Sequence, residues 1–504
     1  MTRKTGGRTF ALVWPPNSDP FFPPLSLANL GACLKKDGFD CFPFDLNNAV
    51  YKKVVAASPH FSTGWEKAPG IKAFLALELF GESATADSRR ESCHLEPEVA
   101  PAIRDAFESA ARHISSECYA LGVTVTEAGL LAAALISDMV KKKNGSIPVI
   151  WGGPLLTPEV SSGLLSAFPQ VDAVCWGEGE ETVVEIARRL TSGNTMSGIP
   201  GLAFREDGGI RLPDERARPA DFRKLPPPDF SWVVPGMYER PYLLLQVNRG
   251  CAWGRCNFCA ENAVYPRYRT RDPGSVIRGI TDVINRIDTG LVQFADAMLN
   301  PDPGSLLRFC ECMREAGGLQ WAGGIRASGF TPEQARAMAS SGCVEVMIGT
   351  ESFSDRTLSL MNKNATAADN LAAIETALEA GMYVTCTVMF DFPGETADEL
   401  EQTLASLEKG VILNPDVNLD MTWFTPILGS PVHRDPGRFA IEIMDYGHVH
   451  RLLPEPVARK VVPCEPFWRS LNERRGYQEV KDRVIEAIES ARHGNTTVTD
   501  PGGP

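Results

Sequence analysis

The chain has 504 residues, of which 43% are hydrophobic and 22% are charged, a balance typical of a globular protein with more than one domain. Its net charge is −13 and it has no long basic run, so we expect neither a nucleic-acid partner nor a membrane partner. The N-terminus lacks the apolar core of a signal peptide, no apolar run is long enough to cross a bilayer, and the 13 cysteines show no disulfide framework. We therefore expect a cytoplasmic protein.

The first part of the chain alternates strand patterns with helical patterns. Residues 9–14 form a continuous apolar run, a helical pattern covers residues 25–36, and Pro43 makes the next run, 41–44, an edge strand. Further strand patterns, each followed by a helical pattern, lie at residues 120–125, 148–151 and 173–176. This alternation predicts a doubly wound, Rossmann-like parallel sheet. A mostly helical insertion is expected at residues 46–118, and its function cannot be read from the sequence.

Ligands of doubly wound sheets bind beyond the carboxyl ends of the strands. Several small residues stand at these predicted ends, and glycine in particular lets a ligand approach the backbone closely. The candidate ligand-binding residues at this edge are Pro15, Thr124, Gly152, Gly153, Gly177 and Gly179.

A hairpin and a linker precede a second region of strand–helix alternation. Residues 201–205 and 210–212 flank an Asp-Gly-Gly turn, and the proline-rich residues 213–235 predict a semi-rigid linker. Six strand patterns follow, at residues 242–247, 291–295, 319–325, 344–349, 383–390 and 418–424. They predict a partial (β/α)6 barrel, whose chemistry would lie at the carboxyl ends of its strands.

Three cysteines stand directly after the first strand of this barrel. Cys251, Cys256 and Cys259 have the spacing C-x4-C-x2-C, and the next cysteines are Cys310 and Cys312. Thiols this close together in a protein of cytosolic character are metal ligands more often than disulfide partners. A cluster that only carries electrons is normally held by four cysteines. The loop therefore predicts a [4Fe–4S] cluster with one iron open to an exchangeable ligand; the alternative is three cysteines buried in the core.

This loop resembles the cluster motif of the radical S-adenosylmethionine (SAM) enzymes, in which the open iron chelates the methionyl part of SAM. Phe258, just before the last cysteine, matches that motif. The usual spacing of the family is C-x3-C-x2-C, so this chain has one additional residue between Cys251 and Cys256. Gly254 can accommodate it because glycine is conformationally permissive.

The resemblance also implies residues that bind SAM. Asp296 follows the second barrel strand, where the family contacts the SAM amino group. Arg326 follows the third strand and could pair with the SAM carboxylate, or could instead form a surface salt bridge. Glu351 and Ser352 follow the fourth strand and match the position that holds the ribose hydroxyls. The later Met361-Asn362-Lys363 also matches the family.

The first half of the chain resembles the cobalamin-binding domain that precedes the catalytic domain in many radical SAM enzymes. The Pro15-Pro16 pair, the Gly152-Gly153-Pro154 turn and Gly177-Glu178-Gly179-Glu180 carry this resemblance. The Asp-x-His-x-x-Gly signature of other corrinoid proteins is absent from the sequence, so we expect base-off cobalamin without a histidine ligand. The alternative is a Rossmann-like domain that binds no corrin.

Three domains are expected, with a hairpin and a linker between the first and the second. Residues 1–200 are assigned to the cobalamin-binding domain, 201–236 to the hairpin and linker, 237–428 to the radical SAM barrel and 429–504 to a small helical C-terminal domain. Within the last of these, residues 479–492 predict a helix and residues 495–504 a disordered tail. Asp445, His448, His450 and Cys464 could be read as a metal site, but their spacing favours a solvated face.

Together these features predict a cobalamin-dependent radical SAM C-methyltransferase with a [4Fe–4S] cluster, SAM and cobalamin as cofactors. The resemblance implies reductive cleavage of SAM and methylation of an unactivated carbon in a natural product or precursor peptide. It also implies a small-molecule or peptide substrate and a reducing partner such as flavodoxin or ferredoxin. The first alternative is a non-methylating rearrangement, cyclisation or oxidation with the same cofactors. The second is a non-catalytic corrinoid or iron–sulfur carrier.

Overall fold

The structure is a computed structural model of the chain. It describes residues 9–16, 20–59, 61, 70–154, 156–213, 215–217, 219–239, 242–287, 289–317, 319–410, 414–472, 476–483 and 486. Backbone contacts divide the chain into two compact units with interleaved segments. The first unit comprises residues 1–245, 275–289 and 445–466, and the second comprises residues 246–274, 290–444 and 467–504. The predicted boundaries at residues 200, 236 and 428 stay predictions.

The first unit is built on a seven-stranded sheet of order β2-β1-β3-β4-β5-β6-β7. Its parallel strands are β1 (Thr9–Trp14), β2 (Cys41–Asp45), β3 (Cys118–Thr124), β4 (Val149–Gly152) and β5 (Ala173–Cys175). The predicted hairpin forms β6 (Leu202–Glu206) and β7 (Gly209–Arg211), which extend the sheet in antiparallel fashion. Asp207 and Gly208 have φ values of 50° and 78°, as a tight hairpin turn requires. The doubly wound fold is confirmed, with β2 at the edge.

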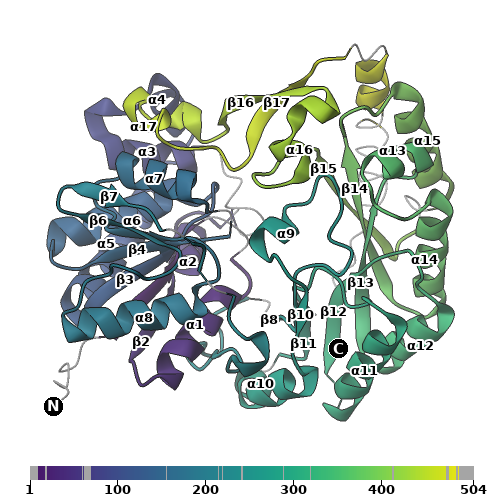
Figure 1. The fold of residues 1–504 in the computed structure, drawn as a ribbon, viewed down its shortest axis with the longest axis horizontal. Helices are drawn as coiled ribbons and strands as arrows, with labels where there is room; N and C mark the ends of the chain where they lie inside the picture. Colours follow the sequence, from purple (N-terminus) through teal and green to yellow (C-terminus); the bar gives the residue numbers. More distant parts are fainter. Residues whose placement is uncertain are drawn as a thin grey trace. The chain divides into compact units, whose positions relative to one another are not determined.

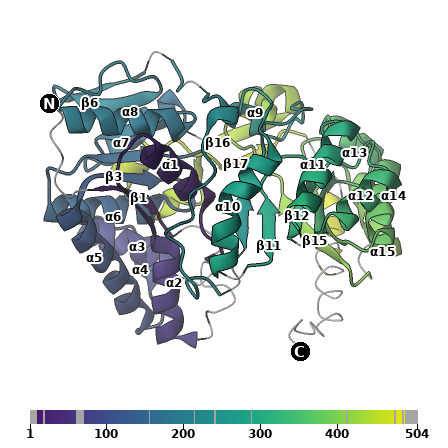
Figure 2. The ribbon, with the colours of Figure 1, turned by 90° about the horizontal axis from the view of Figure 1, so that it is seen from below.

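Helices cover both faces of this sheet. Helices α1 (Leu25–Lys36) and α8 (Gly179–Ser192) lie side by side on one face, and α5 (Val99–Glu117) and α6 (Leu130–Lys143) pack together on the other (Figure 1, Figure 2). Helix α7 (Pro158–Ala167) connects β4 to β5, and the region of the predicted insertion also contains α2 (Leu46–Ala57), α3 (Ile71–Phe80) and α4 (Ala86–Ser92). Phe10, Leu27 and Ile186 belong to a core between the sheet and the α1–α8 pair.

The second sheet has the order β15-β14-β13-β12-β11-β8. Strands that are adjacent in this sheet are therefore also consecutive along the chain among its six strands. Its strands are β8 (Leu243–Leu245), β11 (Leu291–Phe294), β12 (Gln320–Ile325), β13 (Cys343–Glu351), β14 (Tyr383–Phe390) and β15 (Val417–Trp423). Strands β11 to β15 are parallel to one another. All of the barrel strands predicted from the sequence are present, within three residues of their predicted bounds.

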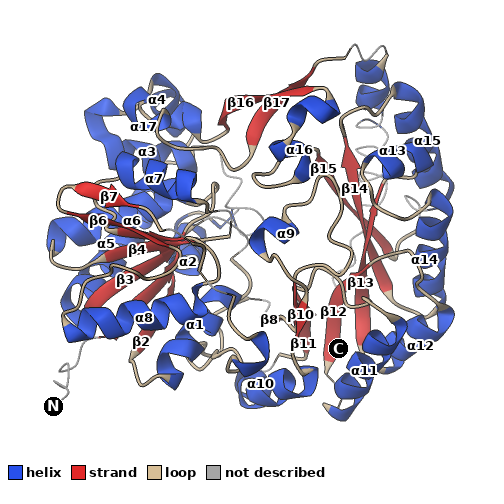
Figure 3. Cartoon of the chain, viewed as in Figure 1, coloured by secondary structure: helices blue, strands red, loops and turns tan. Residues whose placement is uncertain are grey.

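Helices follow the strands of this sheet and lie on its outer face (Figure 3). They are α11 (Pro303–Glu315), α12 (Pro332–Ser340), α13 (Asp355–Leu360), α14 (Ala367–Glu379) and α15 (Ala397–Gly410). Asp302, Thr331 and Thr366 cap the first turns of α11, α12 and α14 by accepting a backbone N–H. Trp321 is fully buried and packs edge-to-face against Phe294 and Phe309.

The C-terminal range contains strands as well as helices. Strands β16 (Ile441–Gly447) and β17 (Pro466–Ser470) form a two-stranded sheet, which the prediction of a helical domain did not include. The alternating pattern Ile-Glu-Ile-Met-Asp-Tyr of β16 is typical of a strand. Of the predicted helix 479–492, residues 479–483 and 486 are helical, and its other residues, like the predicted tail 495–504, lie outside the described residues.

Apart from one helix of 15 residues, the remaining elements are short. They are β9 (Asn248–Arg249), β10 (Arg269–Thr270), α9 (Glu261–Val264), α10 (Pro273–Ile287), α16 (Pro431–Arg434), α17 (Glu455–Ala458) and 3-10 turns at Gly81–Ser83, Phe222–Lys224, Pro436–Phe439 and His450–Leu452. Where the chain is described, it holds no helix that is long and apolar enough to cross a membrane.

Candidate cofactor site

The three predicted cluster ligands lie on the loop between β9 and α9. The Sγ atom of Cys251 is 3.6 Å from the Met298 sulfur, and the Sγ atom of Cys259 accepts the Glu261 backbone N–H at 3.4 Å. The three thiols interact electrostatically with one another, and all three residues are partly exposed. Burial raises the pKa of Cys259 to about 12 and also raises that of Cys256. The structure therefore brings the three thiols together.

Two glycines shape this loop. Gly250 and Gly254 have φ values of 78° and 58°, in the left-handed region that favours glycine. A Cβ atom at Gly254 would collide with the Asn262 side chain, whose amide donates to the Gly254 carbonyl. Gly254 thus provides the turn that accommodates the additional residue of the C-x4-C spacing.

The three thiols are the type of donor that an iron–sulfur cluster takes. Over the described ranges, no three Cys, His, Asp or Glu side chains converge closely enough to bind one metal ion. A cubane cluster binds its cysteines through separate irons, so its ligands stand further apart than those of a mononuclear site. Three partly exposed thiols on one short loop match three irons of such a cluster.

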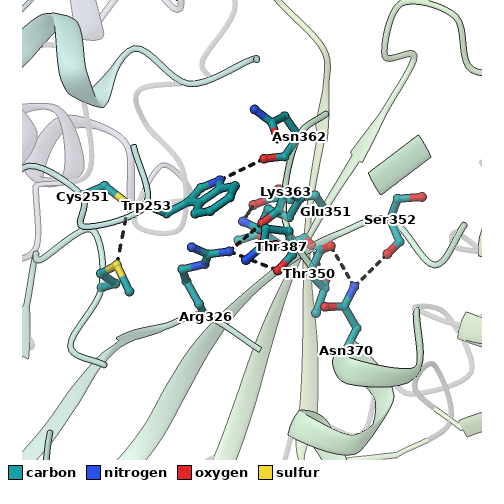
Figure 4. A network of polar contacts seen from close by, with 12 residues as sticks. Cys251, Trp253, Arg326, Thr350, Glu351, Ser352, Asn362, Lys363, Asn370 and Thr387 are labelled. Carbon is teal, nitrogen blue, oxygen red and sulfur yellow. Dashed lines mark hydrogen bonds and ion pairs between the residues drawn. The ribbon is translucent and has the colours of Figure 1, made fainter. Parts of the chain in front are cut away.

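A buried ion pair lies beside the cysteine loop. Lys363 Nζ is 2.7 Å from Glu351 Oε1, and the two side chains are only 10% and 11% exposed (Figure 4). Burial alone lowers the pKa of Lys363, but Glu351 and Cys256 together outweigh it, so this pKa is raised. The Lys363 ammonium also lies 5.7 Å from the centre of the Phe258 ring. A positive charge is therefore held between Glu351 and the cysteine loop.

The backbone conformation at the end of β13 orients Glu351 toward Lys363. The register between β13 and β14 shifts between Gly349 and Glu351, and Glu351 has a φ of 63°, so its side chain turns away from the regular strand alternation. A Cβ atom at Gly349 would lie 2.8 Å from Lys363 Nζ, so the absence of a side chain at Gly349 leaves the ammonium in this position undisturbed. Lys363 belongs to the Met361-Asn362-Lys363 match, from which no role for its side chain could be predicted.

The Arg326 side chain contacts neighbouring protein groups. Its Nη2 group donates to the carbonyls of Lys363 and Asn364, at 2.6 and 3.3 Å, and its guanidinium carbon is 5.0 Å from the centre of the Trp253 ring. Asn300 Oδ1 accepts the Arg326 backbone N–H at 2.9 Å. Figure 4 shows Arg326 between Trp253 and the end of β13. The guanidinium is thus fixed beside the cysteine loop.

Two other residues that were predicted to contact SAM form hydrogen bonds within the protein. The buried carboxylate of Asp296 accepts the backbone N–H groups of Val247, at 3.0 and 3.2 Å, and of Asn248. Burial raises the Asp296 pKa to about 8. The Ser352 hydroxyl is 3.1 Å from that of Thr403 and is buried. These contacts favour structural roles for Asp296 and Ser352, and their contacts with SAM stay predictions.

The predicted edge residues of the first unit stand at the carboxyl ends of β1, β3, β4 and β5. Pro15 is buried after β1, and Thr124 ends β3. A Cβ atom at Gly152 would meet no atom within 4 Å, whereas one at Gly153 would collide with the Val125 carbonyl. Cβ atoms at Gly177 and Gly179 would meet Arg216 at 2.9 Å and Leu30 at 3.3 Å. Gly152 is therefore the edge glycine whose open space suits a ligand.

A cavity of about 220 Å³ lies at the same end of β3 and β4. Apolar side chains from α6, α7 and the loops before them line it, together with Val461 and Val462. These two valines belong to residues 445–466, the C-terminal segment of this unit. Glu127 Oε2 holds that segment by accepting the backbone N–H groups of Cys464 and Glu465, both at 2.8 Å. Burial raises the Glu127 pKa. Sequence patterns contain no signal for this return of the chain to the first sheet.

His450 belongs to this returning segment. Its Nδ1 accepts the Gly447 backbone N–H at 3.1 Å, and its Nε2 lies 2.8 Å from the Val461 carbonyl, to which it donates. His450 is 7% exposed, so the interpretation of a solvated face was wrong for this residue. It secures the fold of the segment.

Comparison with known proteins identifies the class. A family model of the Radical SAM superfamily matches residues 245–407, the range that contains the cysteine loop, Arg326, Glu351 and Lys363. Residues 245–407 thus match the model of a radical SAM domain.

Two solved structures share the fold of nearly the whole chain. The radical SAM methyltransferase TsrM from Kitasatospora setae, solved with cobalamin and a [4Fe–4S] cluster bound, is 16% identical with a TM-score of 0.65, over 97% of this chain and 92% of that one. The cobalamin-dependent SAM radical enzyme OxsB, solved with aqua-cobalamin and SAM bound, is 16% identical with a TM-score of 0.68, over 96% of this chain and 67% of that one. The chain has the fold of cobalamin-dependent radical SAM enzymes, and the predicted resemblance is confirmed.

Two relatives found by sequence similarity are named for different activities. An uncharacterized methyltransferase of Pyrococcus horikoshii is 27% identical over 356 residues, which are 69% of this chain and 73% of that protein. The anaerobic magnesium-protoporphyrin IX monomethyl ester cyclase of Cereibacter sphaeroides is 26% identical over 306 residues. The latter match spans 58% of this chain and about half, 48%, of the cyclase.

Proposed function

We propose that the protein is a cobalamin-dependent radical SAM methyltransferase that acts on an unactivated carbon of a natural product or precursor peptide. The observation that carries the proposal is the three-cysteine loop beside the Glu351–Lys363 pair and Arg326. The fold shared with TsrM and OxsB supports it, as does the relative named as a methyltransferase. A reducing protein such as flavodoxin or ferredoxin is the expected electron donor.

The cysteine loop would hold the cluster. Cys251, Cys256 and Cys259 would ligate three irons and leave the fourth open to SAM. When bound, the cluster would supply the electron for reductive cleavage of SAM, and cobalamin would supply the methyl-transfer chemistry. Lys363 and Arg326 place two positive charges near Cys256, and these charges offset the negative charge of the thiolates.

Two side chains have groups available for SAM. In the described part of the chain, Lys363 donates to Glu351 Oε1, and no group donates to Oε2. This oxygen can accept a ribose hydroxyl. Within the same residues, Arg326 donates through Nη2 alone, so the hydrogens on its Nε and Nη1 remain available to donate to a carboxylate.

The carboxyl edge of the first sheet would hold cobalamin. The open space at Gly152 admits a ligand next to the backbone, and the apolar cavity at the ends of β3 and β4 provides further room. Because the sequence lacks the corrinoid histidine motif, cobalt would be base-off without a histidine ligand.

The relative named as a cyclase favours one alternative, a cyclisation that transfers no methyl group. The products of SAM discriminate between these reactions. We expect the anaerobically reconstituted, reduced protein to form both 5′-deoxyadenosine and S-adenosylhomocysteine. Formation of 5′-deoxyadenosine alone would favour the cyclase-like alternative. A protein that turns over no SAM would instead be a carrier of the cofactors.

A further inference from the structure

The four residues between Cys251 and Cys256, residues 252–255, pack against residues 360–364, which comprise the last residue of α13 and the loop that follows it. Trp253 Nε1 donates to the Asn362 carbonyl at 2.9 Å, and the Asn362 side chain donates back to the Arg255 carbonyl at 2.8 Å. The Arg255 guanidinium carbon is 5.2 Å from the centre of the Trp253 ring. The longer cysteine loop is therefore ordered by contacts of its own residues.

The contact between these loops continues on the other side of Cys256. The backbone N–H of Asn257 donates to the Met361 carbonyl at 2.8 Å, and its side chain donates to the Leu360 carbonyl at 2.7 Å. Asn257 is buried. Cys256 thus lies within a segment that is hydrogen-bonded to residues 360–364 on both of its sides.

Arg326 is held by the same two loops. Its guanidinium lies 5.0 Å from the Trp253 ring centre, within the range of a cation–π contact. Its Nη2 donates to the carbonyls of Lys363 and Asn364. These contacts leave Nε–H and Nη1 available on a group whose position is already set.

We propose that Trp253 is a positioning residue that fixes Arg326 for the carboxylate of SAM, and that the four-residue spacing between Cys251 and Cys256 places Trp253 there. The inference rests on the proposed function, since SAM is its ligand. An unrestrained arginine loses side-chain freedom when it binds a carboxylate. Contact with the indole ring removes that freedom before SAM arrives.

Binding measurements test the role of Trp253. Affinities for SAM and for decarboxylated SAM are measured by calorimetry on anaerobically reconstituted protein. We expect Trp253→Ala to weaken SAM binding roughly tenfold, or about 1.4 kcal/mol, without loss of iron and without an effect on decarboxylated SAM. Trp253→Phe keeps an aromatic ring and should lose less. Arg326→Ala should show the same selectivity as Trp253→Ala, and the double variant should be little weaker than Arg326→Ala alone.

A second tryptophan provides the matched control. Trp468 Nε1 also donates to a backbone carbonyl, that of Phe424, at 3.0 Å, so Trp468→Phe should leave both affinities unchanged. Equal loss of SAM and decarboxylated SAM in Trp253→Ala would show a general structural role and overturn the inference. So would wild-type affinity in Trp253→Ala alongside weak binding in Arg326→Ala. A wild-type protein that binds no SAM would instead overturn the proposed function, and this inference with it.

A deletion tests the role of the spacing. Ala252 is exposed, and its removal gives the usual C-x3-C-x2-C spacing while keeping every cysteine. We expect this variant to retain its iron and to bind SAM as weakly as Trp253→Ala. Wild-type SAM affinity in the deletion variant would overturn the role assigned to the four-residue spacing.

Discussion

Lys363 and Glu351 form an ion pair, with Nζ and Oε1 2.7 Å apart, in a setting where both side chains are about nine-tenths buried. A buried charge without its partner costs far more than an exposed one. The pair therefore links the end of β13 to the loop after α13, and the same loop contacts the cysteine segment through Asn362.

Removing either charge should destabilise the protein. We expect Glu351→Gln or Lys363→Met alone to lower the free energy of unfolding by about 3–5 kcal/mol, and the double variant to lose less than the sum of the two. Calorimetric melting of the apo-protein measures this coupling. The partly exposed pair Arg104–Glu78 is the control, and Glu78→Gln should cost no more than about 1 kcal/mol. Additive single effects would contradict the coupling.

Glu351→Gln should also weaken SAM binding, because Oε2 loses its charge. A lost charge-assisted hydrogen bond typically costs about 1.5–3 kcal/mol, and the iron content should not change. SAM affinity of the reconstituted variant is the measurement. Unchanged affinity would make Glu351 a purely structural partner of Lys363.

Replacing Cys251, Cys256 and Cys259 together by Ala should remove the cluster iron and SAM cleavage. Cys312, which is likewise partly exposed but lies on α11, is the control, and Cys312→Ala should keep both. Iron is measured after anaerobic reconstitution. About four irons per chain in the triple variant would contradict the assignment of these ligands.

Strand and helix positions could be predicted because their signals are local. The apolar runs of β1 and β14 and the Asp207-Gly208 turn are visible in the sequence itself. The partners of the polar groups could not be predicted, since they depend on contacts between distant residues. Ser352 turns to Thr403 and Asp296 to the backbone of Val247, and no local pattern reveals either choice.

Asp296 should make stability depend on pH. Burial raises its folded pKa to about 8, although its bonds from backbone N–H groups oppose the rise; the unfolded value is near 3.9. The folded state then binds the proton between these values and the unfolded state does not. The contribution of Asp296 to the free energy of unfolding is therefore fully present below about pH 4. It decreases as the pH rises to about 8, by about 1.4 kcal/mol per unit of pKa shift.

Melting of the apo-protein across this pH range checks the sign. Asp296→Asn cannot titrate, so the advantage of wild-type over variant should shrink from pH 5 to pH 8 and then stay constant. An advantage that grows with pH would mean that the N–H donors outweigh burial and hold Asp296 ionised.

Gly152→Leu should block cobalamin uptake without harming the fold. A Cβ atom at this position meets no protein atom within 4 Å, and the rest of the leucine side chain would extend into the space assigned to the ligand. Gly145→Leu, in the turn before β4, is the control, since a Cβ atom there makes only an ordinary contact at 3.7 Å. Absorbance of bound cobalamin after reconstitution is the measurement. Full uptake by Gly152→Leu would show that cobalamin does not bind at this edge of the sheet.

The cobalt ligand can be tested on the same samples. We expect electron paramagnetic resonance of the Co(II) form to show no nitrogen superhyperfine splitting, because the sequence has no corrinoid histidine motif. Splitting from a nitrogen nucleus would contradict base-off binding without a histidine.

Glu127 should hold the returning C-terminal segment onto the first sheet. Its Oε2 accepts the N–H groups of Cys464 and Glu465, and a Cβ atom at Gly447 would lie 2.8 Å from Oε1. Glu127→Ala leaves two donors without this acceptor, at about 1–3 kcal/mol for each one that stays buried. We expect faster hydrogen exchange in residues 447–466 while β3 and β4 stay protected. Glu127→Gln keeps an acceptor oxygen and should exchange nearly as slowly as the wild-type protein. Unchanged exchange in Glu127→Ala would show that other contacts hold the segment, such as the Arg451–Glu91 ion pair.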